Sequence, residues 1–217
     1  MNVIILAAGK GERLRPLTNN RPKCLIELFG KSLLQRQIEL YQKLGITDIT
    51  IVTGYKYEQI NFPNTTIIYN PNFKTTNMLE TLFCAEQKIS DSTIVSYGDI
   101  VFQQNVLELL IDSKDDISLI IDDNWKNYWE QRFTDPLSDA ESLVIHDGYI
   151  SEIGQKTSSY EKICGQYIGL MKFQNSGISK IKEYYHYAKE NSHNNVNILN
   201  NSIPFMQSYL TDFLNSI

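Results

Sequence analysis

The chain has 217 residues, of which 42% are hydrophobic and 21% charged, and this length and composition fit one large globular domain. No apolar run approaches the roughly 18 residues of a transmembrane helix, and the N-terminus lacks the basic segment of a signal peptide, which excludes membrane and secreted classes. The formal net charge of −5 and the three scattered cysteines exclude a general nucleic-acid binder, a disulfide framework and a zinc cluster, so we expect a cytoplasmic protein.

The first 121 residues alternate predicted strands with predicted helices. Residues 2–7 form a short, mostly apolar run typical of a buried parallel strand, and a long polar loop over 8–32 follows. Further strands are predicted over 48–53, 66–69, 92–97 and 117–121, with helices over 33–44, 77–89 and 106–111. This alternation predicts the α/β class, with a doubly wound, mostly parallel sheet.

Beyond residue 121 the pattern changes. Residues 122–140 are polar and aromatic, and residues 142–153 predict a hairpin around Asp147-Gly148, a strong turn signal. The remaining predicted elements are a strand over 167–173, a helix over 176–189, an asparagine-rich loop over 191–201 and a last helix over 204–214. We interpret residues 1–217 as a single domain in which 122–217 form a smaller β/α part.

Basic residues concentrate in the loop after the first strand. Residues 10–23 hold five basic side chains against the single acid Glu12: Lys10, Arg13, Arg15, Arg21 and Lys23. A solvated basic loop is the simple explanation, but the loop also contains Gly9 and Gly11 and follows a buried strand. Together these features favour an anion site.

Two common nucleotide-binding motifs fail in this region. Gly9 and Gly11 begin a dinucleotide fingerprint, but Leu14 occupies its third glycine position. The tripeptide over 30–32 imitates the end of a P-loop, yet Leu25 stands where the first glycine of that motif belongs.

The run that remains reads LAAGKGERLRPLT over residues 6–18 and RPK over 21–23. It resembles the opening motif of the nucleotidyltransferases that make activated sugars and choline from NTPs, L-A-A-G-x-G-x-R-L-x-P-L-T followed by P-K, and matches every fixed position. The resemblance continues through 52–55, 97–100, 152–156 and 165–170, and so covers nearly the whole chain. Within the family the sequence is most similar to the small phosphocholine-type cytidylyltransferases, on the basis of Asn77 with Thr81, Asp123 with Trp125, and Asp212.

This resemblance implies a Rossmann-like fold and a Mg²⁺-dependent transfer of CMP from CTP to a small phosphorylated acceptor, with release of pyrophosphate. It implies nucleotide binding by residues 1–121, acceptor binding by 122–217, and a pathway that decorates a bacterial surface, such as capsule polysaccharide synthesis. Phosphocholine, phosphoethanolamine and phosphoglutamine all stay open as acceptors, and monomer and homodimer both stay open. The alternatives are a sugar-1-phosphate uridylyl- or thymidylyltransferase and a non-catalytic, nucleotide-binding regulatory subunit.

The side chains of the loop have the chemistry that this resemblance implies. Arg13 offers a planar fork for the outgoing phosphates, and Lys23 would reach the α-phosphate. Asp99 follows a strand, where it would either hold Mg²⁺ or simply cap the strand end. Small residues let backbone N–H groups approach a triphosphate, and Asn77 can pair with cytosine. The expected nucleotide-binding residues are Leu6, Ala7, Ala8, Gly9, Gly11, Asn77, Thr81 and Gly98.

The acceptor site is expected in the second part of the chain. Lys156 matches a family lysine that contacts the acceptor phosphate, and the alternative is a solvated hairpin lysine. Asp123 and Trp125 resemble a wall for a cationic or zwitterionic acceptor, although Trp125 and Trp129 equally fit the core face of a short helix. The other expected acceptor-binding residues are Gly165, Tyr167 and Asp212.

Relatives of this type continue, after the segment matching 204–214, into a strand with a Trp/Tyr-x-Glu-Ile-Asp motif whose last carboxylate joins the acid matching Asp99 at the metal. The motif is absent from this sequence. We therefore expect a chain truncated at its C-terminus, in which one carboxylate holds Mg²⁺ loosely unless Asp212 substitutes.

Overall fold

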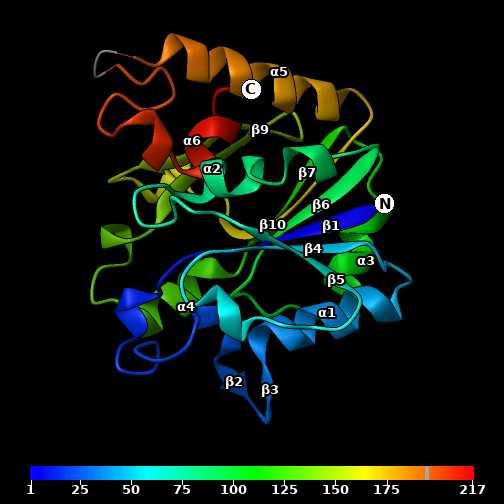
Figure 1. Ribbon diagram of the computed structural model, residues 1–217. Helices are drawn as coiled ribbons and strands as arrows, with labels where there is room; N and C mark the ends of the chain where they lie inside the picture. Colours follow the sequence, from blue (N-terminus) through cyan, green and yellow to red (C-terminus); the bar gives the residue numbers. More distant parts are fainter. Residues whose placement is uncertain (194–195) are drawn as a thin grey trace.

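The computed structural model describes residues 1–193 and 196–217. A six-stranded sheet with the order β5-β4-β1-β6-β10-β7 forms its centre (Figure 1). Its strands are β1 (Asn2–Ala7), β4 (Ile49–Thr53), β5 (Thr65–Tyr69), β6 (Ser92–Tyr97), β7 (Ile117–Asp122) and β10 (Gln166–Gln174). β1 pairs in parallel with β4 and β6, whereas β10 runs antiparallel to both β6 and β7. The predicted α/β class with a mostly parallel sheet is confirmed.

Helices cover both faces of this sheet (Figure 1). They are α1 (Leu33–Lys43), α2 (Met78–Phe83), α3 (Gln104–Asp112), α5 (Ser176–Asn191) and α6 (Leu210–Leu214). A further helix, α4 (Trp125–Arg132), packs in a separate small cluster with Leu137, Ala140 and Ile163. Successive side chains of a strand point to opposite faces. Ile4 of β1 accordingly packs in the core formed with α2, α5 and α6, and Ile5 packs in the core formed with α1 and α3.

Two small antiparallel pairs stand outside the main sheet. β2 (Glu27–Leu28) pairs with β3 (Lys31–Ser32), and β8 (Glu141–His146) pairs with β9 (Tyr149–Lys156). The predicted hairpin turn is confirmed, because Asp147 and Gly148 both have positive φ, 50° and 84°. Short 3-10 turns occupy Glu12–Leu14, Lys23–Leu25, Tyr57–Gln59, Glu86–Lys88, Pro136–Ser138, Tyr160–Lys162 and Phe205–Gln207.

Two predicted helices are shorter than the sequence suggested. The helix expected over 77–89 ends at Phe83, whose ring stacks on Tyr185 of α5 with 3.5 Å between centroids, and a separate 3-10 turn follows. The helix expected over 204–214 is broken into a 3-10 turn and α6. Two carbonyls near the break accept hydrogen bonds from outside the helix: Asn77 donates from its backbone to Met206 and from its side chain to Gln207.

Other predicted elements match within about three residues at each end. The loop expected over 8–32 also contains two 3-10 turns and the β2–β3 pair, which the polar composition did not reveal. The asparagine-rich loop expected over 191–201 includes residues 194–195, which lie outside the described residues. In the part of the chain that the structure describes, no helix combines the length and hydrophobicity needed to cross a bilayer.

The strand β10 joins the two parts of the chain. It belongs to residues 122–217, yet it lies between β6 and β7, which belong to residues 1–121. Its Lys172 is fully buried and donates to the carbonyl oxygens of Ile111 and Ser113, at 3.0 and 2.6 Å. Both parts therefore share one sheet.

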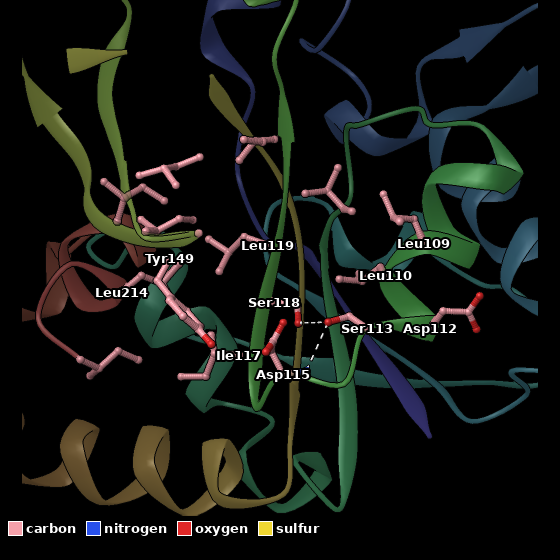
Figure 2. A pocket seen from close by; sticks show the side chains of 17 residues that line it. Leu109, Leu110, Asp112, Ser113, Asp115, Ile117, Ser118, Leu119, Tyr149 and Leu214 are labelled. Carbon is pink, nitrogen blue, oxygen red and sulfur yellow. Dashed lines mark hydrogen bonds between the residues drawn. The ribbon is translucent and has the colours of Figure 1, made fainter. Parts of the chain in front are cut away.

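An apolar cavity of about 710 Å³ follows the outer edge of β7 (Figure 2). Its walls include Leu109 and Leu110 of α3, Leu119 of β7, Tyr149 at the tip of the β8–β9 hairpin and Leu214 of α6. Among the described residues, this edge of β7 has no strand partner.

Candidate active site

A second cavity, of about 180 Å³, opens where β1 and β6 end. Because these neighbouring strands are parallel, their carboxyl ends meet at one edge of the sheet, where open α/β sheets bind ligands. Residues from the loop after β1, from the segment after β6 and from the start of α2 line it: Leu6, Ala7, Gly9, Gly11, Arg13, Leu14, Lys23, Cys24, Met78, Gly98 and Asp99.

Gly9 and Gly11 of the loop differ: Gly11 allows Lys23 to pack closely against the loop, and Gly9 leaves open space beside the backbone. Gly11 has a φ of 62°, and a Cβ there would lie only 2.9 Å from the Cβ of Lys23. Its carbonyl accepts from the Thr18 hydroxyl at 2.8 Å, which closes the loop. At Gly9 a Cβ would meet no atom within 4 Å, so the space beside this backbone is open to a phosphate.

An ion pair joins the two sides of the cavity. Nζ of Lys23 lies 2.5 Å from Oδ2 of Asp99, and these side chains are 33% and 25% exposed. The backbone under Asp99 is fixed, because the N–H of Gly98 donates to the carbonyl of Leu6 at 2.9 Å. The structure therefore brings together the lysine and the acid that the sequence placed on different segments.

Arg13 lines the same cavity with an exposed side chain. The acid beside it, Glu12, forms ion pairs with Lys10 and Arg15 instead, at 3.7 and 3.3 Å. Among the described residues Arg13 has no carboxylate within ion-pair distance, so its guanidinium is available to an incoming anion.

Asp99 is the one acid among the described residues that line the cavity. No group of three or more His, Cys, Asp or Glu side chains suited to a metal occurs among the described residues. The single carboxylate of Asp99 does not fit a zinc site, which needs three or four protein ligands. It fits a Mg²⁺ site, because proteins hold Mg²⁺ with one or two carboxylates plus substrate phosphates and water.

Cys24 also lines the cavity, but its thiol is not reactive. Burial, with a further contribution from the charge of Asp99, raises the pKa of its thiol to about 12. Because the thiolate is the nucleophilic form, Cys24 is a packing residue at neutral pH.

Three of the expected nucleotide-binding residues do not line the cavity. Ala8 is buried, and its carbonyl accepts from the N–H of Tyr55 at 3.0 Å. Asn77 caps α2 by accepting from Met78 N–H at 2.9 Å, and Thr81 donates to the carbonyl of Asn77 at 3.0 Å. Sequence reasoning in turn missed Leu14, Cys24 and Met78, apolar neighbours of the polar residues that it selected.

The expected acceptor residues also lie outside this cavity. Lys156 ends β9 with an exposed side chain, and Asp123 is exposed in the turn after β7. Gly165 is buried beside β7, where a Cβ would lie 3.1 Å from the carbonyl oxygen of Asp122. Tyr167 of β10 packs edge-on against Tyr97, with 5.9 Å between ring centroids, and Tyr97 directly precedes Gly98 and Asp99.

Trp125 and Asp212 have structural partners. Trp125 is 4% exposed and packs against Trp129 and Tyr160, at centroid distances of 6.0 and 6.2 Å, as the core-face alternative anticipates. Asp212 is 4% exposed and caps α6 by accepting from the N–H of Tyr209 at 2.9 Å. It also accepts from the Asn200 amide at 3.0 Å.

Glu141, at the start of β8, is an acidic residue that the sequence did not single out. Partial removal of its carboxyl group from water raises the pKa of Glu141 from 4.5 to about 7, and the negative charges of Asp212 and Asp139 raise it further. Folding thus disfavours the carboxylate form of Glu141.

This shift predicts a pH-dependent effect of Glu141→Gln on stability. Below about pH 4.5 the carboxyl group of Glu141 is protonated in both the folded and the unfolded chain, so it does not lower stability. Above about pH 7 it is ionised in the folded protein, and its charge lowers the free energy of unfolding by the full amount. Because Glu141 retains solvent contact, water screens part of that cost, and we expect the substitution to add about 1 kcal/mol to the free energy of unfolding at pH 8 but almost nothing at pH 4. Urea unfolding at both pH values measures this, with Glu190→Gln on the exposed end of α5 as the control, and equal effects at both pH values would contradict it.

Comparisons with known proteins match this chain over most of its length. A model of the MobA-like NTP transferase domain matches residues 3–142. The chain is 36% identical to the CTP:phosphoglutamine cytidylyltransferase of Campylobacter jejuni, over 100% of this chain and 88% of that protein. It is 34% identical to the choline-phosphate cytidylyltransferase of Streptococcus pneumoniae over 48% of this chain and 47% of that protein.

Solved structures show the same fold. The CTP:phosphocholine cytidylyltransferase from Streptococcus pneumoniae superposes with a TM-score of 0.69 at 22% identity, over 99% of this chain and 84% of that one. The inositol-1-phosphate CTP transferase from T. maritima superposes with a TM-score of 0.71 at 19% identity, over 99% of this chain and 80% of that one.

Proposed function

The chain belongs to the MobA-like NTP transferase family, and from this premise we propose that it is a cytidylyltransferase. It transfers CMP from CTP to a small phosphorylated acceptor and releases pyrophosphate. The observation that carries this proposal is the full-length identity of 36% to a relative named for CTP and phosphoglutamine. The convergence of Arg13, Lys23 and Asp99 on one cavity supports it.

The reaction needs no protein base. The nucleophile is an oxygen of the acceptor phosphate, whose second pKa of about 6 leaves it ionised at neutral pH. That oxygen forms a bond to the α-phosphorus of CTP while the bond from this phosphorus to the β-phosphate bridging oxygen breaks, and the electron pair leaves with pyrophosphate. Catalysis then depends on positioning and on neutralising charge.

Each side chain of the cavity has a distinct part in that task. The open backbone at Gly9 approaches the phosphates, and the Arg13 fork binds the departing pyrophosphate. Lys23 binds the α-phosphate, where negative charge develops during transfer.

Nucleotidyltransferases of this family generally use a divalent metal. We propose Mg²⁺, held by Asp99 together with phosphate oxygens. When bound, Mg²⁺ neutralises phosphate charge and aligns the triphosphate.

The acceptor is proposed to be a phosphorylated amine or amino acid, and the exposed Lys156 and Asp123 are the side chains proposed to contact it. The buried or partly buried Trp125, Gly165, Tyr167 and Asp212 are proposed to shape the site. Phosphoglutamine is the first acceptor to test, because the relative named for it matches the whole chain, whereas the choline-phosphate relative matches about half. A role in bacterial capsule polysaccharide synthesis, which the sequence resemblance implies, is proposed with it.

The proposal predicts a preference for CTP over UTP of about tenfold or more in kcat/KM, about 1.4 kcal/mol. Cytosine has an amine where uracil has a carbonyl. A site whose polar groups bond to cytosine therefore leaves some of those groups without a hydrogen-bond partner when uracil binds. Asn77, one residue from Met78 on the cavity wall, remains the proposed contact with the base. Pyrophosphate release with each nucleotide and phosphoglutamine measures the preference.

The rival functions give different results in that assay. Equal kcat/KM for CTP and UTP would favour a sugar-1-phosphate nucleotidyltransferase, with glucose 1-phosphate as the control acceptor. CTP binding in a calorimeter without pyrophosphate release with phosphoglutamine, phosphocholine or phosphoethanolamine would favour a regulatory subunit.

A further inference from the structure

Lys23 and Asp99 carry opposite charges that the proposed reaction needs for two different partners. Asp99 is needed for a metal cation and Lys23 for a phosphate, yet in the structure the two groups neutralise each other across 2.5 Å. They line the same cavity as Arg13, Gly9 and Gly11. While this ion pair is formed, the carboxylate of Asp99, which is expected to hold the metal, is already bound to the ammonium group of Lys23.

The surrounding contacts single out Lys23 among the cations of the loop. Lys10 and Arg15 pair with Glu12 on the exposed side of the loop, and Arg13 has no acid within ion-pair distance among the described residues. Lys23 is the loop cation that reaches the acid after β6.

We propose that Lys23 and Asp99 form an exchangeable ion pair, in which Lys23 occupies the metal position on Asp99 until a divalent metal and the nucleotide arrive together. The inference rests on the proposed function, and it adds that the ion pair controls the binding of metal and nucleotide at the same site. The incoming metal replaces the ammonium group on Asp99, and a phosphate oxygen replaces the carboxylate on Lys23. Neither charge is left unpaired in the partly buried site at either end of the exchange.

The local backbone suits a movement of Lys23 alone. The segment at Asp99 is held by the hydrogen bond from Gly98 to Leu6, and the backbone of Lys23 is held by the 3.1 Å bond from Ile26 N–H to its carbonyl. The aspartate side chain is short, whereas the lysine ammonium ends a flexible four-carbon stem. Exchange therefore needs only a rotation of the lysine side chain.

A consequence is that metal and nucleotide help each other to bind. A metal alone must displace Lys23 from Asp99, and a nucleotide alone must draw Lys23 away and leave Asp99 unpaired. Each ligand removes the obstacle to the other, and such coupling is reciprocal.

Four proteins test this exchange: the wild type, Lys23→Gln, Arg13→Gln and Asp99→Asn. Binding of Mn²⁺ alone is followed by electron paramagnetic resonance, and binding of CTP in the presence of saturating Mn²⁺ by calorimetry. Lys23→Gln should bind Mn²⁺ alone about tenfold more tightly than the wild type, because its competitor on Asp99 is gone, but should bind Mn²⁺–CTP about tenfold more weakly.

Arg13→Gln is the matched control, because it removes another cation from the same cavity that does not contact Asp99. It should weaken Mn²⁺–CTP binding while changing the affinity for Mn²⁺ alone less than about twofold. Asp99→Asn should lose the binding of Mn²⁺ alone and should bind CTP more weakly than the wild type in saturating Mn²⁺.

A lower or unchanged affinity of Lys23→Gln for Mn²⁺ alone would overturn the exchange, as would equal gains in Lys23→Gln and Arg13→Gln or unchanged Mn²⁺ binding in Asp99→Asn. A wild-type protein that binds Mn²⁺ alone at Asp99 but fails to bind Mn²⁺–CTP would overturn the proposed function instead.

Discussion

Replacing Asp99 with asparagine is expected to lower kcat/KM for pyrophosphate release from CTP by about 10³-fold. The substitution keeps the size of the side chain but removes the one acid that lines the cavity among the described residues. Without that charge the proposed metal is held poorly, and Lys23 loses its ion-pair partner in the ligand-free protein. Steady-state kinetics with CTP and phosphoglutamine measure the loss.

The fold should survive this substitution, since both members of the ion pair are partly exposed and water can solvate the released lysine. Circular dichroism checks this point. Asp147→Asn, which changes an exposed acid at the tip of the β8–β9 hairpin and outside the cavity, is the matched control and should cost much less. If Asp99→Asn retained activity within about tenfold of wild type, the metal role given to Asp99 would be wrong.

Arg13→Ala should lower kcat/KM by about 10²-fold or more. Arg13 lines the cavity without a carboxylate partner among the described residues, so its charge is available to the pyrophosphate that leaves. The loss of a charge-assisted fork raises the energy of the transition state, while the folded protein loses no ion pair recorded for this residue.

Arg15→Ala gives the comparison for Arg13→Ala. Arg15 is a neighbouring exposed arginine, but it pairs with Glu12 and does not line the cavity. Its substitution should leave kcat/KM within about threefold of wild type. Turnover of Arg13→Ala in that same range would remove Arg13 from the mechanism.

Local sequence patterns were sufficient for most strands and for the centre of the site. The apolar run before Gly9 and the one before Asp99 predicted two parallel strands, and parallel neighbours bring their carboxyl ends together. The glycines, Arg13 and Lys23 lie on one loop, so a short segment carried most of the signal.

The remaining features depend on partners distant in sequence. Asn77 stays the proposed contact with the base, but its amide and backbone N–H also donate to the carbonyls of Gln207 and Met206, in the segment where the predicted last helix is broken. Similarly, α2 ends where Phe83 stacks on Tyr185. The local periodicity of hydrophobic residues cannot predict such contacts, because tertiary packing overrides the helix propensity of a segment.

The position of β10 has a consequence for the order in which the sheet is assembled during synthesis. β7 leaves the ribosome before β10, yet its strand neighbour in the sheet is β10. Until Gln166–Gln174 has been made, β7 has no place beside β6, and the carbonyls of Ile111 and Ser113 lack the buried amine of Lys172. Such long-range pairing is slow, and nascent chains expose apolar strands meanwhile. We infer that the nascent sheet is completed by insertion of a strand at an interior position, after its flanking strands have emerged.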